Sequence, residues 1–181
     1  MVHYRLVPEL STVRVHATSN VHPIDGEASG LAGNVTFTLV GGEPDLAQPV
    51  AAEVTLAVHD LRSGNPAYDA EMRRRLQARR HPLITGRLTA AERLDADGRF
   101  RVTGDLSFHG ATRQVTADIA LDLAGTGRLV ASWEQTIDIR DFDLKPPRIL
   151  LFRVDPEVRV EVDLVADLAV PGPQPAGESP P

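Results

Sequence analysis

The dominant feature of this sequence is a strict alternation of apolar and polar positions, repeated in segments that short turns separate. Residues 99–109 place an apolar or small residue at every second position, and residues 114–123 repeat the pattern after a tight turn at Gly110 and Ala111. A period of two gives each strand one apolar and one polar face. Antiparallel strands of this kind can curl around an apolar interior while their outer faces meet water.

The same alternation extends over most of the chain. It recurs in residues 12–18, 31–39, 50–58, 129–139 and 158–164. Turn-forming residues separate these runs: residues 19–30 are turn-rich, residues 41–45 are Gly-Gly-Glu-Pro-Asp, and residues 95–98 are Asp-Ala-Asp-Gly. With one more strand expected from Leu83, the pattern predicts about eight strands, with boundaries placed to within a few residues.

One segment has a helical rhythm. Residues 65–66, Asn-Pro, are typical of an N-cap followed by the first helical position. Tyr68, Met72 and Leu76 then recur at four-residue spacing, which predicts one face of an amphipathic helix ending before His81. The predicted fold is therefore all-β, an eight-stranded antiparallel barrel with one inserted amphipathic helix.

Size and charge limit the function classes. The 181 residues favour one domain over residues 1–170, followed by a disordered Pro/Gly-rich tail over residues 171–181. The net charge of -6 argues against nucleic acid as a partner, since a nucleic-acid binder needs a basic field. Without cysteine, disulfides and zinc–thiolate sites are excluded. No transmembrane segment and no export signal are apparent, so a cytoplasmic location is expected.

Small side chains at inward positions indicate that the barrel encloses a cavity. Aromatic residues are only 4% of the chain. An eight-stranded barrel is either filled by its own side chains or holds one small ligand, and side-chain volume decides which. We therefore expect an apolar ligand, with a filled core as the alternative. The predicted lining residues are Val15, Ala17, Val35, Phe37, Val54, Leu56, Leu106, Phe108, Ala117, Ile119, Ala131, Trp133 and Val160.

Several motifs, in order along the chain, resemble those of the YceI-like family. The most recognisable is the hairpin at residues 103–112, Thr-Gly-Asp-Leu-Ser-Phe-His-Gly-Ala-Thr. Others are Tyr-Arg-Leu at residues 4–6, the Pro-Leu-Ile at residues 82–84, and Arg-Asp-Phe at residues 140–142. The resemblance covers about residues 4 to 166 and is carried by the order and spacing of these motifs.

The resemblance implies a lipocalin-like barrel that binds a polyisoprenoid or another long-chain apolar or amphiphilic molecule, such as a fatty-acid-like compound, for storage, shielding or transport. Two departures from the family pattern bear on the ligand. Many members have a Phe-Phe-Asp-type stretch after the helix start, where residues 72–76 here are Met-Arg-Arg-Arg-Leu. Many also have a phenylalanine two places beyond the aliphatic residue, where this chain has Gly86. Both departures leave the fold unaffected but bear on ligand length and headgroup.

Arginines are concentrated in the predicted helix and the turn after it. If the helix crosses the barrel mouth, their guanidinium groups can form bidentate hydrogen bonds with a phosphate or carboxylate headgroup. Arg73, Arg75 and Arg79 are the candidates for this contact. The alternative is a solvated helix face, which most charge runs form.

No catalytic residue, cofactor or metal site is predicted. The six histidines lack the close spacing of metal ligands, and no serine has a Gly-x-Ser-x-Gly context. An alternative from another class is a barrel enzyme acting on an apolar small substrate. It needs an inward polar group, from His16, Gln135 or a shift of strand register. A further alternative is a filled-core stress-response module without a ligand. Sheet edges and apolar surface are compatible with a homodimer.

Overall fold

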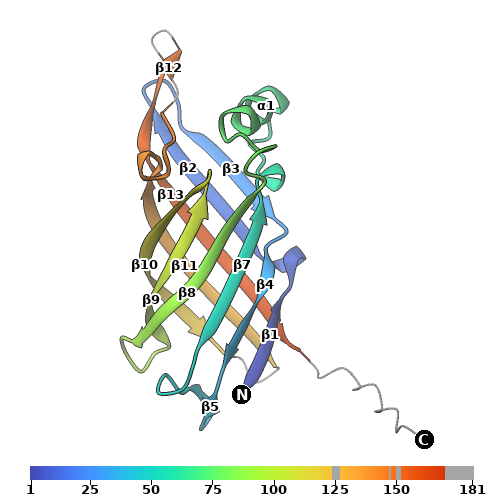
Figure 1. The fold of residues 1–181 in the computed structure, drawn as a ribbon, viewed down its shortest axis with the longest axis vertical. Helices are drawn as coiled ribbons and strands as arrows, with labels where there is room; N and C mark the ends of the chain where they lie inside the picture. Colours follow the sequence, from blue (N-terminus) through green and yellow to red (C-terminus); the bar gives the residue numbers. More distant parts are fainter. Residues whose placement is uncertain (124–126, 147, 150–151, 170–181) are drawn as a thin grey trace, which may run out of the picture.

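Eight strands form a closed antiparallel barrel in the computed structural model, which describes residues 1–123, 127–146, 148–149 and 152–169 (Figure 1). The ring closes because the first strand pairs with the last. The predicted all-β barrel is thereby confirmed, whereas the tail predicted at residues 171–181 lies outside the described residues. In order around the ring, the strands are β1 (Val2–Leu6), β4 (Ala32–Phe37), β7 (Ala51–Ala57), β8 (Leu83–Arg93), β9 (Arg99–Phe108), β10 (Ala111–Asp122), β11 (Arg128–Asp138) and β13 (Phe152–Leu168).

A hairpin formed by β2 (Thr12–Ser19) and β3 (Ile24–Ser29) extends the sheet beyond β13. The sequence pattern predicts only turns for residues 19–30, so this prediction is wrong for β3. Its backbone pairs with β2 over six residues, and Ala28 faces the core at 2% exposure. Hairpin pairing with β2 therefore outweighs the weak strand propensity of a segment that contains Asp25, Gly26 and Glu27.

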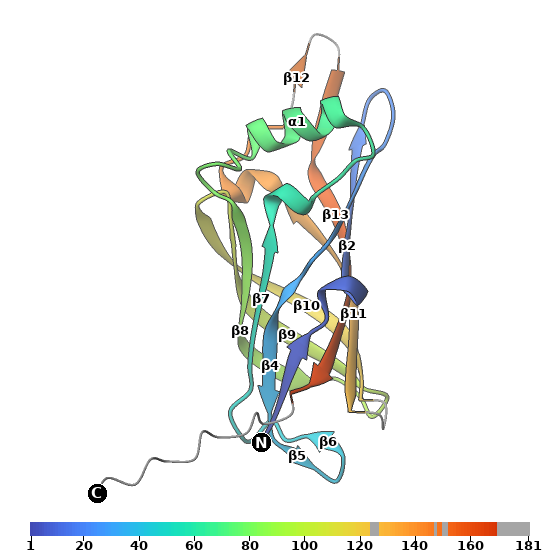
Figure 2. The same cartoon turned by 90° about the vertical axis from the view of Figure 1, so that its right-hand side faces the viewer.

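Helix α1 (Pro66–Arg75) lies across the end of the barrel opposite the N-terminus, here called the upper end (Figure 2). Asn65 caps it as predicted, its Oδ1 accepting hydrogen bonds from the backbone N–H groups of Ala67 at 2.9 Å and Tyr68 at 3.3 Å. Only part of the predicted apolar face of the helix packs against the core. Met72 and Leu76 contact the core, but Tyr68 is half exposed, so the buried stripe is narrower than its spacing indicates.

Short elements complete the two ends. At the lower end, where the N-terminus lies, β5 (Leu39–Val40) and β6 (Glu43–Pro44) form a separate two-stranded hairpin (Figure 2). The remaining pieces are three 3-10 turns and one short strand: η1 (Pro8–Leu10), η2 (Val58–Asp60), η3 (Ile139–Phe142) and β12 (Arg148–Ile149). Within the described part of the chain, α1 does not have the length and apolar character needed to span a bilayer, and no other helix does.

The most completely packed part of the core lies toward the lower end on the side formed by β1, β4, β11 and β13. The Tyr4 and Phe37 rings stack there with centroids 5.5 Å apart, and Leu129 and Ala166 are 2% and 0% exposed. At the upper end, Phe142 of η3 is 1% exposed and its ring lies 5.7 Å from that of Phe108. The inner wall between these two ends is less completely covered, and it forms the candidate site.

Candidate functional site

Strand pairing places all the predicted lining residues on the inner face of the barrel. Residues directly opposite each other on paired strands share a face. Val15 pairs with Val160, and Ala117 pairs with Val102. The apolar residues of neighbouring strands therefore lie side by side on the same face of the sheet. The register therefore agrees with the sequence pattern at these positions.

The inner face is only partly covered by protein. Three of the predicted lining residues, Phe37, Leu56 and Ala131, are buried and belong to the core. The others keep part of their surface accessible although they face inward; these are Val15, Ala17, Val35, Val54, Leu106, Phe108, Ala117, Ile119, Trp133 and Val160. Accessible apolar side chains on an inner face indicate an interior that is not completely filled.

Gly86 on β8 gives the most direct indication of open space in the interior. It pairs with Val54 on one side and with Leu106 on the other, so its own face is the inner one. A Cβ atom added to Gly86 would meet no atom within 4 Å. At Gly104 on the neighbouring strand, by contrast, a Cβ would come within 2.7 Å of the Arg87 carbonyl oxygen. Close backbone approach thus requires glycine at position 104, whereas position 86 faces free volume.

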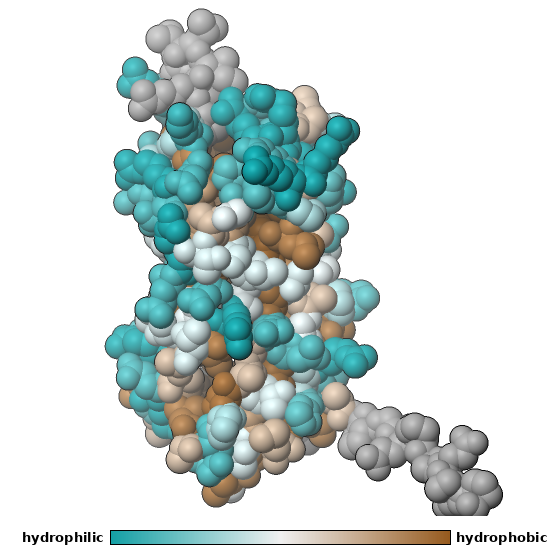
Figure 3. Space-filling model, viewed as in Figure 1, coloured by the Kyte–Doolittle hydropathy of each residue, from teal (hydrophilic) through white to brown (hydrophobic). Residues whose placement is uncertain are grey.

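The outer surface has the opposite character. Figure 3 shows hydrophilic residues over much of the face seen in Figure 1, with hydrophobic areas between them in the middle and lower parts. A depression of about 400 Å³ crosses β7 to β10. Its lining is largely outward-facing and polar, with Thr55, Thr85, Arg87, Asp105 and Ser107 among its members, and it also borders the strand positions Val54 and Gly86. This surface does not have the chemistry of a hydrocarbon site.

A buried carboxylate holds α1 over the upper end. Asp69 is 6% exposed, and its Oδ1 accepts hydrogen bonds from Ser63 N–H at 2.7 Å and Ser63 Oγ–H at 2.6 Å. These two hydrogen bonds, with smaller contributions from the positive charges of Arg73 and Arg62, lower the pKa of Asp69 below its ordinary value. The ionised carboxylate thereby ties the helix to the loop that precedes it.

The helix arginines are placed at this end, but not all of them are available to a ligand. Arg75 Nε lies 2.6 Å from Glu71 Oε1, and Arg74 also binds Glu71. Hydrogen bonds from Arg74 and then Arg75 lower the pKa of Glu71 to about 2. Arg73 is partly buried and Arg79 is exposed. A headgroup contact from Arg73, Arg75 or Arg79 stays a prediction.

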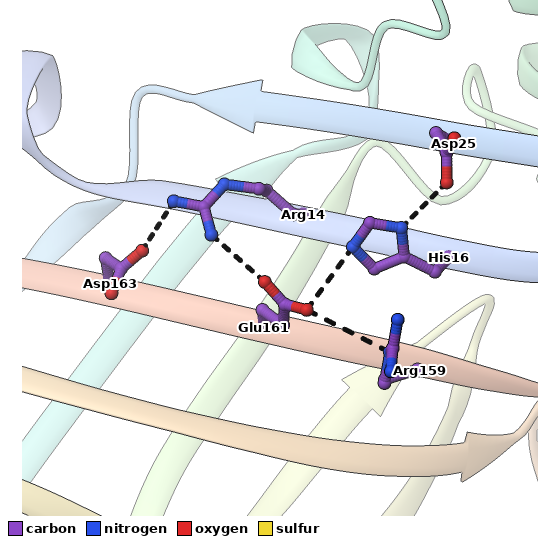
Figure 4. Close-up of polar contacts among 6 residues, drawn as sticks. All are labelled: Arg14, His16, Asp25, Arg159, Glu161 and Asp163. Carbon is purple, nitrogen blue, oxygen red and sulfur yellow. Dashed lines mark hydrogen bonds and ion pairs between the residues drawn. The ribbon is translucent and has the colours of Figure 1, made fainter.

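His16 faces outward, which contradicts its suggested role inside the barrel. Its Nδ1 lies 2.7 Å from Asp25 Oδ1 and its Nε2 lies 3.4 Å from Glu161 Oε1 (Figure 4). Arg14 binds Glu161 at 3.0 Å and Asp163 at 2.8 Å in the same network. This network joins β2, β3 and β13 on the outer surface. The route to catalysis through His16 is therefore wrong.

Gln135 is the other inward polar group that the alternation indicates. It pairs with Val160 and is partly buried on the inner face. An uncharged amide can orient a ligand by hydrogen bonding. Among the described residues, no three histidine, aspartate or glutamate side chains come together as a metal site.

Arg93 on the inner face is a site residue that the sequence pattern does not reveal. Simple alternation from Gly86 and Leu88 would turn Arg93 outward. A β-bulge between Leu88 and Ala90 shifts the register by one residue, so Arg93 pairs with the inward-facing Phe100. Its guanidinium carbon lies 4.8 Å from the centre of the Phe100 ring. No local sequence signal marks this bulge.

Comparisons with solved structures identify the same fold elsewhere. Burkholderia cenocepacia BcnA is 19% identical, with a TM-score of 0.74, and the match covers 88% of this chain and 98% of that one. A polyisoprenoid binding domain from Saccharophagus degradans is 13% identical, with a TM-score of 0.72 and coverage of 93% and 100%. The Campylobacter jejuni YceI protein is 16% identical, with a TM-score of 0.64 and coverage of 80% and 84%. At these identities, the likeness shows the fold alone.

Sequence comparison adds the family. No curated protein sequence matches this chain. The YceI-like domain matches residues 4–166, which is nearly the whole chain. This range includes every strand of the barrel apart from the first two residues of β1 and the last two of β13. The chain belongs to the YceI-like family.

Proposed function

We propose that this protein binds a polyisoprenoid or another long-chain apolar or amphiphilic molecule inside its barrel, and so stores, shields or transports it. Membership of the YceI-like family supports this proposal, as does the structural similarity to a domain described as polyisoprenoid binding. The observation that carries it is the partly exposed apolar inner wall, with free volume at Gly86. That wall offers hydrocarbon contacts and few polar ones.

Hydrocarbon burial supplies the binding energy. Each buried methylene contributes ~0.8 kcal/mol, so a chain with sixteen of them gains ~13 kcal/mol gross before ordering costs are subtracted. Affinity should therefore increase with chain length until the free volume is filled. A headgroup adds selectivity to this binding.

Gly86 bears on the width of the site. The YceI-like pattern that this sequence resembles often has phenylalanine at this position, whereas this chain has glycine and therefore no side chain there. A ligand segment can take the volume that a phenyl ring would fill. We therefore propose a site wide enough at this level for a methyl-branched isoprenoid chain.

Binding without catalysis is the activity that this wall supports best. Of the two inward polar groups suggested by the sequence, only Gln135 remains, since His16 lies in the outer network. The other polar residues that the register places on this face include the arginines Arg93 and Arg113. A carboxamide does not transfer protons at neutral pH. An enzymatic role would require a titratable group that approaches the bound chain.

Trp133 provides a direct test, because it is the only tryptophan of the chain and faces inward. Titration with geranylgeraniol should change its fluorescence emission saturably, with one ligand per chain. In the matched control, the double variant Trp133→Phe with Glu134→Trp moves the reporter to the outer face and should give no such change. A wild-type protein whose emission is unaffected by geranylgeraniol and by hexadecan-1-ol would contradict the proposal.

A further inference from the structure

The lower end of the barrel contains a guanidinium group facing an apolar pocket. The pocket has a volume of about 200 Å³ and is lined by Arg93, Phe100, Leu121 and Leu123, together with Glu43. Phe100 is 4% exposed, and its ring faces the guanidinium in a cation–π contact. Arg93 is thus held in place before any ligand arrives, which reduces the entropy cost of binding through it.

Glu43 occupies part of the hydrogen-bonding capacity of Arg93. Its Oε2 lies 3.1 Å from Arg93 Nη2, and the two side chains are 66% and 30% exposed, respectively. An ion pair exposed to this extent contributes little to stability. Glu43 belongs to the β5–β6 hairpin, which is a separate sheet, so it can move away without breaking a strand pairing of the barrel. It is therefore a displaceable counter-ion.

Between this pocket and Gly86, the inner face of β8 is not fully covered by protein. Along β8, the inner-face residues Gly86, Leu88, Ala91 and Arg93 all keep part of their surface exposed. Seven residues of strand separate the first from the last, which is roughly 20 Å. That length suits an extended hydrocarbon chain with its polar end at Arg93.

We propose that Arg93 binds an oxyanion, a carboxylate or a phosphate, carried by the ligand whose chain lies in the barrel, and that Glu43 competes with it. The planar guanidinium presents paired N–H donors that match both oxyanions in a bidentate manner. The headgroup is then recognised at the lower end of the barrel, away from the helix arginines. This inference rests on the proposed function, because the chain supplies most of the affinity.

Calorimetric titration of hexadecanoate and hexadecan-1-ol, which share a chain and differ in charge, tests the inference. The wild-type protein should prefer the acid. Arg93→Met keeps the apolar stem and should weaken hexadecanoate binding about tenfold, with hexadecan-1-ol little changed. Glu43→Gln removes the competing charge and should strengthen hexadecanoate binding. Arg87→Met, on the outer face of β8 where the Arg87 side chain is 75% exposed, should alter neither.

The possible outcomes distinguish a failure of the oxyanion site from a failure of the proposed long-chain ligand binding. If both ligands bind and neither Arg93→Met nor Glu43→Gln changes the preference, the oxyanion site is wrong and the barrel function stands. If neither ligand binds and geranylgeraniol also fails, the proposed function is wrong. Inorganic phosphate, titrated alone, should bind far more weakly than hexadecanoate. Arg93-dependent phosphate binding of equal strength would assign the site to a free anion and overturn the headgroup assignment.

Discussion

Gly86→Trp should weaken the binding of a long-chain ligand by about a hundredfold while leaving the barrel folded. The indole would fill the free volume beside Val54 and Leu106 and displace three to four methylenes of the ligand, each contributing ~0.8 kcal/mol. Tryptophan also has a higher strand propensity than glycine, so stability should not fall. Affinity for geranylgeraniol and the midpoint of thermal unfolding are the two measurements.

Two controls separate a blocked cavity from a general effect of the large side chain. Arg87→Trp places the same group on the outer face of the same strand, where Arg87 has a 75% exposed side chain, and should leave affinity unchanged. Gly86→Ala adds one methyl group and should have a small effect. If Gly86→Trp instead unfolds the protein and Gly86→Ala destabilises it, position 86 faces packed atoms and the cavity is wrong.

Phe142→Ala should lower the free energy of unfolding by about 3–5 kcal/mol, the largest loss that we expect from a single truncation. The Phe142 ring is 1% exposed and contacts Phe108, and its carbonyl oxygen accepts a hydrogen bond from His109 Nδ1–H at 3.1 Å. Truncation would leave a cavity between η3 and the upper rim of the barrel. Urea unfolding, extrapolated linearly to water, measures the change.

Phe108→Ala is the matched comparison. Phe108 contacts the same ring but keeps part of its surface accessible on the inner wall, so its truncation removes fewer buried contacts. The loss of stability should be clearly smaller than at Phe142. Equal losses would show that the inner wall around Phe108 is as tightly packed as the surroundings of Phe142 in η3. That result would contradict an open interior.

The alternating pattern was sufficient to predict the barrel because period two determines which side chains share a face. Val15, Ala117, Trp133 and Val160 could be assigned to the interior without coordinates for that reason. The β3 strand was missed because its residues have weak strand propensity and lack a clear alternation, so only the hairpin pairing with β2 makes it a strand. A strand of this kind is identified only by its partner.

The site was less predictable than the fold. The inward position of Arg93 depends on a one-residue bulge, and alternation counted through residues 88–90 gives the opposite face. The sequence does mark Gly86 as a departure from the family pattern, but whether a missing side chain leaves open space depends on what surrounds it. The arginines of α1 attract attention by their number, yet Arg74 and Arg75 are paired with Glu71 on the same helix.

The most direct test of the account is to identify what the purified protein carries. The protein is prepared from cells, denatured in organic solvent, and the released material is quantified by mass spectrometry. We predict one long-chain isoprenoid or comparable apolar molecule per chain, and little or none from Gly86→Trp prepared in the same way. A wild-type protein that releases no such molecule, and that takes up none from an added panel of isoprenoids, would contradict the account.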